Sequence, residues 1–257
     1  MSLYIETLGA GEDLVLLHGW GMHGGIWGGV RDALAQVFRL HVVDLPGYGY
    51  SAVQGSWTPG RVAAQLAAAL PPAIQVCGWS LGGQIALEWA LAAPRQIKRL
   101  ILVAVNPCFV CDVEWRWGVS STVLEAFAAD LREDDEGALV RFLSLQAQGD
   151  RAARAVMRQL RRELFRRGKP AATVLAAGLS ALQYSDLRAC IPSIRQPTLV
   201  VHGGNDTLAP LPAAVWLAQH LPAGKLVEID GASHAPFLSQ SALFSRELVD
   251  FCHDSVG

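Results

Sequence analysis

The chemistry of this chain centres on one serine, Ser80, within the pentapeptide Gly78-Trp79-Ser80-Leu81-Gly82. An apolar run at 74–77 precedes it and is typical of a buried strand, while residues 81–91 have the character of a helix. The G-x-S-x-G spacing between strand and helix predicts a tight turn that lifts the serine hydroxyl out of the sheet. The positive end of the helix dipole then points at that hydroxyl. The alternative is an ordinary strand–helix turn in which glycine and serine have no catalytic role.

A serine hydroxyl needs an adjacent base to become a nucleophile. Among the seven histidines, His234 is the best placed, because it follows the last predicted strand and so lies at the carboxyl edge of the sheet. His18 reaches the same edge, but it precedes a glycine-rich loop that it is expected to support. His23 stays undecided. Structural or solvent-facing positions are expected for the remaining four, His41, His202, His220 and His253.

A third group must orient the imidazole and stabilise its cation. Asp206 follows the penultimate predicted strand and is the first candidate. Its alternative interpretation is an ordinary turn or helix-capping aspartate. Asp230 and Asp44 are rivals for the role, although Asp230 lies very close to His234 along the chain.

The oxyanion of a tetrahedral intermediate needs two backbone donors. The N–H of Leu81, directly after the nucleophile, is one candidate. The other is the N–H of Trp20, in the loop His18-Gly19-Trp20-Gly21 that follows an early apolar run. Glycine on both sides of Trp20 lets the backbone approach a ligand closely.

The elements that must position these residues alternate between strand and helix at both ends of the chain. Apolar runs at 14–17, 40–43, 74–77, 98–104, 198–201 and 225–229 predict strands, and helical stretches separate them. This alternation is typical of an α/β fold: a mostly parallel, twisted sheet with helices on both faces. From 107 to 187 only helical stretches are found. We therefore expect a core of residues 1–106 and 188–257, and an all-helical cap inserted at 107–187.

Composition excludes several classes of function. The 257 residues are 51% hydrophobic and carry a net charge of −2, which gives no general argument for binding nucleic acid or a membrane. No membrane span or secretory signal is recognised. The five widely spread cysteines favour a reducing compartment, so the cytoplasm is expected. Cys108 and Cys111 form a C-x-x-C pair without a second pair or a nearby histidine, and we expect neither a metal nor a cofactor.

Five motifs together resemble the α/β-hydrolase superfamily, whose chain order of serine, acid and histidine is also found here. They are Leu17-His18-Gly19-Trp20-Gly21, Asp44-Leu45-Pro46-Gly47-Tyr48-Gly49, Gly78-Trp79-Ser80-Leu81-Gly82-Gly83, Gly204-Asn205-Asp206 and Gly231-Ala232-Ser233-His234-Ala235-Pro236. A narrower resemblance is to the BioH-type esterases of biotin synthesis, which hydrolyse the methyl ester of pimeloyl-acyl carrier protein. It depends on Asn106-Pro107-Cys108-Phe109, on the stretch from Arg141 to Gln146 and on His234-Ala235-Pro236-Phe237.

The resemblance also implies a substrate site. Carried over by motif, it comprises Trp20, Ser80, Leu81, Phe142, Leu143, Ser144, Leu145, Gln146 and His234. Phe142 and Gln146 would line an acyl pocket beneath the cap.

A basic helix in the expected cap is consistent with an acidic carrier protein as partner. At 100° per residue, Arg154 and Arg158 lie on one side of this helix with other arginines, opposite an apolar side. With Arg141, they are the candidate docking residues. The alternative is a solvated helix face without a partner.

The sequence thus predicts a monomeric serine carboxylesterase with the triad Ser80, Asp206 and His234. Two alternatives use the same triad: a general short-acyl carboxylesterase and a hydrolase of carbon–carbon bonds. A third is a ligand-binding protein that keeps the fold without turnover.

Overall fold

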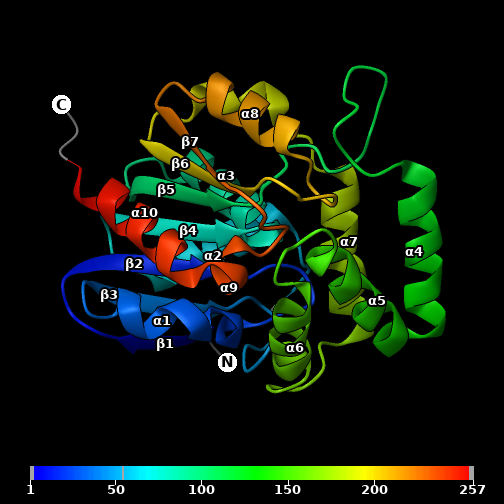
Figure 1. Ribbon diagram of the computed structural model, residues 1–257. Helices are drawn as coiled ribbons and strands as arrows, with labels where there is room; N and C mark the ends of the chain where they lie inside the picture. The colour runs from blue at the N-terminus through cyan, green and yellow to red at the C-terminus, as the bar shows by residue number, and fades with distance from the viewer. Residues whose placement is uncertain (1–2, 54, 255–257) are drawn as a thin grey trace.

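A seven-stranded sheet forms the centre of the computed structural model, which describes residues 3–53 and 55–254 (Figure 1). The strands are β1 Tyr4–Leu8, β2 Glu12–Leu17, β3 Phe38–Asp44, β4 Ile74–Trp79, β5 Ile97–Val103, β6 Thr198–Gly203 and β7 Gly224–Ile229. Their order is β1-β3-β2-β4-β5-β6-β7, and only β1 runs antiparallel to its neighbour. The mostly parallel sheet that the sequence predicts is confirmed.

Burial explains which strands the sequence reveals. Every residue of β4 and β6 is buried, as expected for parallel strands covered on both faces. The edge strand β1 is not among the predicted strands, because its residues are half-buried or exposed and form no unbroken apolar run.

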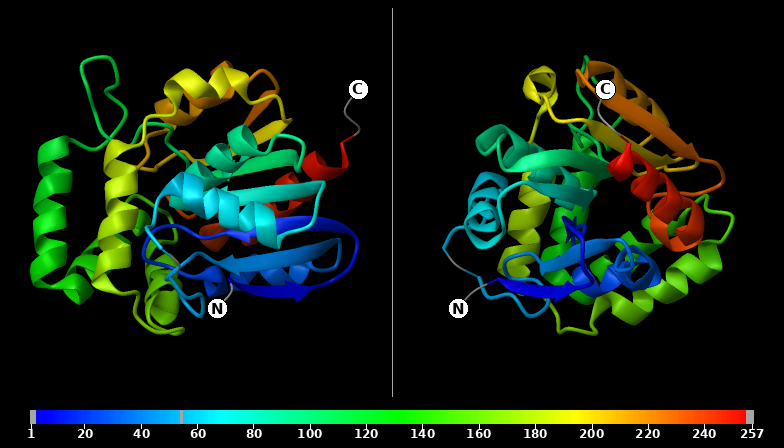
Figure 2. Two further views of the ribbon diagram at one scale, coloured as in Figure 1. Left: turned by 180° about the vertical axis from the view of Figure 1, so that it is seen from behind. Right: turned by 90° about the vertical axis from the view of Figure 1, so that its left-hand side faces the viewer.

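Helices cover both faces of the sheet. The helices of the sheet layers are α1 Gly28–Leu34, α2 Pro59–Ala69, α3 Leu81–Ala92, α8 Leu211–His220, α9 Pro236–Ser239 and α10 Ser241–His253. Helices α2 and α3 pack together on one face, and α1 and α10 pack together on the other (Figure 2). Short 3₁₀ turns at Gly24–Trp27 and Arg188–Ser193 complete the layers. Helix α1 follows directly after the first of these turns.

Four further helices lie between β5 and β6 along the chain: α4 Ser121–Glu133, α5 Asp135–Ala147, α6 Ala153–Leu164 and α7 Ala172–Tyr184. Figure 1 places them together at one end of the sheet. Helix α6 contacts α9, so this is the end at which the loop between β7 and α9 emerges. Residues 107–119, which precede α4, form a loop closed by an isolated bridge between Val110 and Val119 rather than a helix.

The surface pattern of α6 follows its helical periodicity. Val156, Leu160 and Leu164 are buried, whereas Arg154 and Arg158 are exposed. None of the helices in the described part of the chain has the length and hydropathy needed to cross a bilayer.

Candidate active site

Ser80 sits on a strained turn between β4 and α3. Its backbone has φ 53° and ψ −116°, a conformation that residues other than glycine rarely adopt. A side chain at Gly78 would meet the backbone of Gly82, and one at Gly82 would meet the carbonyl oxygens of Leu17 and His18. The two glycines of the motif are therefore required by close backbone approach, in agreement with the tight turn that the sequence predicts.

Three side chains from distant parts of the chain form a hydrogen-bonded relay. The Nε2 atom of His234 lies 3.0 Å from Oγ of Ser80, and its Nδ1 atom lies 2.8 Å from Oδ2 of Asp206. The other carboxylate oxygen of Asp206 accepts from the backbone N–H groups of Leu208 and Ala209, both at 2.9 Å. With Nδ1–H donated to Asp206, Nε2 is free to accept the proton of Ser80.

Asp206 is ionised at neutral pH. Burial by itself raises the pKa of this carboxyl, but attraction to His234 and the hydrogen bond from its ring outweigh burial, and the pKa is lowered from its usual value. His202 lies beneath the same turn, with Nε2 2.6 Å from the carbonyl oxygen of Ala209 and 3.4 Å from Oδ2 of Asp206. Burial lowers the pKa of His202, so it remains neutral and holds the turn that presents the carboxylate.

The two rival carboxylates face other partners. Asp230 forms an ion pair with Arg151 at 2.9 Å on the surface, where both side chains are exposed. Asp44 is fully buried at the end of β3 and contacts Gly24, Tyr50 and Arg167. Neither carboxylate is the hydrogen-bond partner of His234.

The side chain of His18 stabilises the loop that follows β2. Nδ1–H of His18 donates to the carbonyl oxygen of Gly19 at 2.8 Å, and Nε2 accepts from the N–H of Leu45 at 2.9 Å. Burial lowers its pKa to about 4, which keeps the ring neutral. The expectation that His18 supports the loop carrying Trp20 agrees with these contacts.

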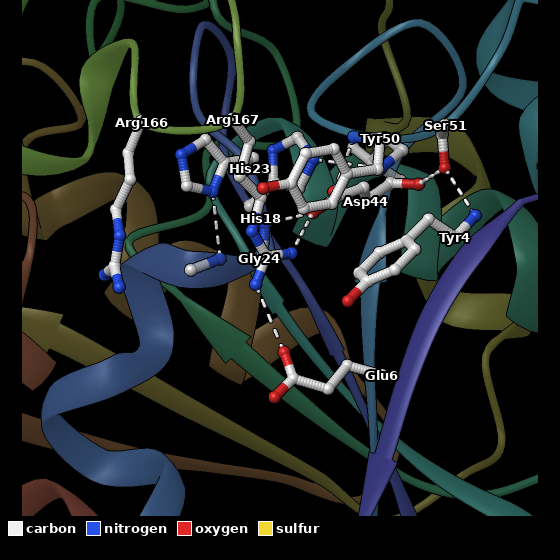
Figure 3. A network of polar contacts seen from close by, with 12 residues as sticks. Tyr4, Glu6, His18, His23, Gly24, Asp44, Tyr50, Ser51, Arg166 and Arg167 are labelled. Atoms are coloured by element: carbon white, nitrogen blue, oxygen red, sulfur yellow. Dashed lines mark hydrogen bonds and ion pairs between the residues drawn. The ribbon is translucent and has the colours of Figure 1, made fainter.

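A charged network holds the same loop from the side (Figure 3). Arg167, in the chain after α6, pairs with Asp44 at 3.0 Å and with Glu6 at 3.1 Å, and Asp44 in turn accepts from the N–H of Gly24 at 2.7 Å. His23 donates from Nε2 to the carbonyl oxygen of Glu163 at 2.7 Å, because its Nδ1 accepts from the N–H of Gly25. His23, undecided from the sequence, is thus a structural link to α6.

The side chain of Trp20 points toward helices α4, α5 and α7. Its Nε1–H donates to the carbonyl oxygen of Leu175 at 2.9 Å. Its ring packs edge-on against Phe142, at 5.0 Å between centroids, and against Phe127 at 5.7 Å. Leu81 is buried as the first residue of α3, and the N–H groups of a helix's first turn lack partners within the helix.

The five residues from Phe142 to Gln146 do not share one face of α5. Phe142, Leu143 and Gln146 are buried, and the carbonyl oxygen of Gln146 accepts from the N–H of His234 at 3.3 Å. Ser144 and Leu145 instead line a surface groove of about 680 Å³ that also includes Arg154 and Arg158. The structure therefore brings part of the implied substrate site to the triad and part to the groove between α5 and α6.

The arginines proposed for docking differ in their partners. Arg141 pairs with Asp130 at 3.2 Å, with both side chains half exposed. Within residues 3–53 and 55–254, neither Arg154 nor Arg158 has an ion-pair partner.

Cys108 lies in a small cluster with Asp112 and Asp186, whose ligand atoms are all within 4.8 Å of one another. The guanidinium of Arg188 lies 2.7 Å from each of the two carboxylates and so compensates one of their two negative charges. Cys111 donates instead to the carbonyl oxygen of Gly118. The C-x-x-C pair is thus part of an ion-paired loop.

Sequence reasoning missed Asp150 and Arg167, and it gave His202 only a general structural or solvent-facing role. Asp150 accepts from the N–H of Ser233, directly before His234. Arg167 resembles the other arginines of its stretch in sequence, and only the fold brings it to Asp44. In the sequence, Asp150 is the only acidic residue of the arginine-rich stretch 146–162, and this is the one signal that could have drawn attention to it.

Comparisons with known proteins give the family. A profile described as alpha/beta hydrolase fold matches residues 14–240. A protein of Nitrosomonas europaea named pimeloyl-(acyl-carrier protein) methyl ester esterase is 46% identical over 99% of both chains. A protein of the same name from Chromobacterium violaceum is 44% identical over 97% of this chain and 98% of its own.

Solved structures agree with the fold. An esterase from Exiguobacterium antarcticum superposes with a TM-score of 0.88 at 23% identity, covering 97% of this chain and 94% of its own. The chain therefore belongs to the alpha/beta hydrolase fold family and, within it, to the family of the pimeloyl-(acyl-carrier protein) methyl ester esterases.

Proposed function

We propose that this protein is a serine carboxylesterase that hydrolyses the methyl ester of pimeloyl-acyl carrier protein, releasing methanol and the free carboxylate, in biotin synthesis. The observation that carries the proposal is the relay in which His234 lies 3.0 Å from the hydroxyl of Ser80 and 2.8 Å from Asp206. The names of relatives at 46% and 44% identity support the substrate.

The reaction proceeds by acyl transfer through Ser80. Its oxygen attacks the ester carbonyl carbon while Nε2 of His234 takes the hydroxyl proton, and Asp206 stabilises the resulting imidazolium. The N–H groups of Trp20 and Leu81 stabilise the oxyanion. The tetrahedral intermediate collapses as His234 gives its proton to the departing methoxide, which leaves as methanol. Water, deprotonated by His234, then attacks the acyl-enzyme and frees the acid and Ser80. No metal or cofactor takes part in this sequence.

The helical segment 107–187 acts as a cap over a core of residues 1–106 and 188–257. Trp20 extends from the core into this segment and packs against Phe142, which supports an apolar acyl site between the two parts. Leu143 and Gln146 are buried on the same helix. The groove containing Ser144 and Leu145 continues the site outward, where a carrier-bound chain would approach.

Arg154 and Arg158 dock the carrier protein, with Arg141 at the margin of the contact. Acyl carrier proteins are small and acidic, so two exposed arginines without ion-pair partners suit them as a surface. Reversal of both charges to glutamate should lower kcat/KM for the carrier-linked ester and weaken its dependence on salt, because steering between exposed charges is screened by salt. The free methyl ester should be hydrolysed as before. The matched control is Arg246→Glu, on α10.

The decisive experiment compares carrier-linked pimeloyl methyl ester with the free methyl ester. We expect a strong preference for the carrier-linked substrate, and Ser80→Ala should abolish hydrolysis of both. Equal rates on both would favour a general short-acyl carboxylesterase, and activity only on ring-cleavage products would favour a carbon–carbon bond hydrolase. A folded protein without any turnover would indicate a ligand-binding protein. Restoration of biotin-independent growth in a cell lacking its own esterase for this step is the matching test in vivo.

The setting of the reaction is the cytoplasm, and the working form is a monomer. All five cysteines are free thiols, which supports a reducing compartment. Light scattering at enzyme concentrations used for the assays tests the monomer.

A further inference from the structure

The chain between α5 and α6 is joined to both loops that carry the acid and the base. Residues 146–152, which run from the last two residues of α5 to the residue before α6, are called the 146–152 segment. Its backbone carbonyl oxygens accept from N–H of His234 at 3.3 Å, from Oγ–H of Ser233 at 2.7 Å and from Nδ2–H of Asn205 at 2.8 Å. The N–H of Arg151 donates to the carbonyl oxygen of Gly231 at 2.9 Å. The loops that present Asp206 and His234 are thus bound by one short stretch of the inserted segment.

Asp150 is the only acidic side chain in the 146–152 segment, and its two carboxylate oxygens have different partners. Oδ1 accepts from the N–H of Ala152 at 2.7 Å, at the start of α6. Oδ2 accepts from the N–H of Ser233 at 2.9 Å, across the boundary to the loop of His234. The side chain is buried, with 7% of its surface exposed, and no ion-pair partner for it occurs within residues 3–53 and 55–254.

A buried carboxylate without a cation is costly, so its position requires an explanation. Hydrogen bonds from backbone N–H groups to an ionised acceptor are about twice as strong as neutral ones. One oxygen would suffice to cap α6, and an asparagine would serve that purpose as well. Only a group with two acceptor oxygens satisfies the N–H of Ala152 and the N–H of Ser233 together.

The second contact lies one residue from the base. His234 must present Nδ1 to Asp206 and Nε2 to Ser80 at the same time, which leaves its ring little rotational freedom. A displacement of about 1 Å caused at a distance from the chemistry can cost about 10²-fold in rate.

We propose that Asp150 is a positioning residue for the base: its carboxylate fixes the backbone of Ser233 and thereby the orientation of His234 between Ser80 and Asp206. The proposal rests on the proposed function, because it assigns His234 as the base. It makes the 146–152 segment part of the machinery for catalysis as well as a connection between two helices.

The test is Asp150→Asn in the full-length protein, assayed with a small free methyl ester so that carrier docking has no influence. The amide has only one acceptor oxygen. Its NH₂ group would therefore face the N–H of either Ser233 or Ala152, and two donors cannot form a hydrogen bond. We expect kcat per active site, titrated with a fluorophosphonate, to fall about 10- to 100-fold with KM within twofold. The rate of fluorophosphonate labelling at Ser80 should fall in parallel.

The matched control is Asp134→Asn. Asp134 begins α5 by accepting from the N–H of Gly137 at 2.9 Å, so the same substitution replaces a helix-capping carboxylate far from His234 and leaves one oxygen for the cap. A purely structural role for Asp150 would lower the unfolding temperature but leave kcat per titrated site unchanged, as in this control. That result would overturn the proposal.

A second variant, Asp150→Ser, keeps one oxygen that can accept from the N–H of Ala152 but removes the acceptor of the N–H of Ser233, without placing an opposing NH₂ group there. It should lower kcat in the same direction, by less, at unchanged KM. Where Asp150→Asn does not fold, this variant decides: unchanged kcat per site overturns the proposal. Absence of ester hydrolysis in the wild-type protein would refute the proposed function instead, before any variant is compared.

Discussion

The two ends of α6 hold two halves of the active site by different kinds of contact. Before its first residue, the 146–152 segment binds the loops of Asp206 and His234 through backbone hydrogen bonds and one carboxylate. After its last residue, Arg167 binds the loop of Trp20 indirectly, through an ion pair with the buried carboxylate of Asp44.

The two kinds of contact predict different consequences when a residue in either half is substituted. A hydrogen bond between backbone groups contributes about 1 kcal/mol net to stability, but it fixes direction closely. A buried ion pair is expensive to break, because one charge is left without compensation. We therefore expect changes near the acid and base to reduce the rate first, and changes near Arg167 to reduce stability first.

The largest expected effect is that of Asp206→Asn. The amide would present a donor to Nδ1 of His234 and impose the wrong tautomer, so kcat should fall about 10⁴-fold, as for the equivalent change in a serine protease. The control is Asp230→Asn, because Asp230 pairs with Arg151 on the surface, and its kcat should stay within twofold of wild type. Steady-state kinetics on a small ester distinguishes the two. A similar loss in both variants would remove Asp206 from its assigned role.

Arg167→Met should be the most destabilising change on the other side of the comparison. Only 11% of the Arg167 side chain is exposed, and Asp44 would remain buried without its cation. The free energy of unfolding should fall by about 3–5 kcal/mol in urea titrations. Arg246→Met, which breaks the exposed pair with Glu247, should change it by less than about 1 kcal/mol. If both variants have the same free energy of unfolding, the ion-paired network around Asp44 does not stabilise the loop that carries Trp20.

A pH effect should come next in size, and it belongs to the half that contains Trp20. Burial lowers the pKa of His18 to about 4, whereas an unfolded histidine titrates near 6.5. Between these values the unfolded chain takes up a proton that the folded chain does not, so stability is lost as pH falls. At about 1.4 kcal/mol per pH unit, the loss attributable to His18 is about 3 kcal/mol. Urea unfolding at pH 4 to 7 should give a flatter curve for His18→Gln than for wild type, and parallel curves would contradict this assignment.

The smallest effect is expected for Arg151→Ala. Its side chain pairs with Asp230 at the surface, with 72% and 77% of the two side chains exposed, although its backbone N–H belongs to the 146–152 segment. Because the backbone bond survives the substitution, stability should change by less than about 1 kcal/mol and kcat by less than twofold. A large loss of kcat, measured in parallel with Asp150→Asn, would mean that side-chain contacts of the 146–152 segment, rather than its backbone hydrogen bonds, position the loops of Asp206 and His234.

Each member of the proposed triad has a local signature in the sequence. Ser80 lies between glycines after an apolar run, and Asp206 and His234 each follow a strand rich in apolar residues. Parallel strands bring their carboxyl ends to one edge, so the fold class itself places the three together. The structure confirms the sheet and brings these side chains within hydrogen-bond distance.

The contacts that orient the triad could not be predicted in the same way. The 146–152 segment acts mainly through backbone carbonyl oxygens, such as those of Gln146 and Gly149, which every residue type carries. Arg167 is separated from Glu6 by most of the chain, and no periodic pattern links them. The edge strand β1 was missed because its half-exposed residues do not form an apolar run.

The most direct test of the central claim is the site and rate of fluorophosphonate labelling. The account predicts stoichiometric labelling of wild type at Ser80, identified by peptide mass spectrometry, and a loss of most of the labelling rate in His234→Ala with the fold intact. Labelling at another residue, or an unchanged rate at Ser80 without the imidazole, would contradict it.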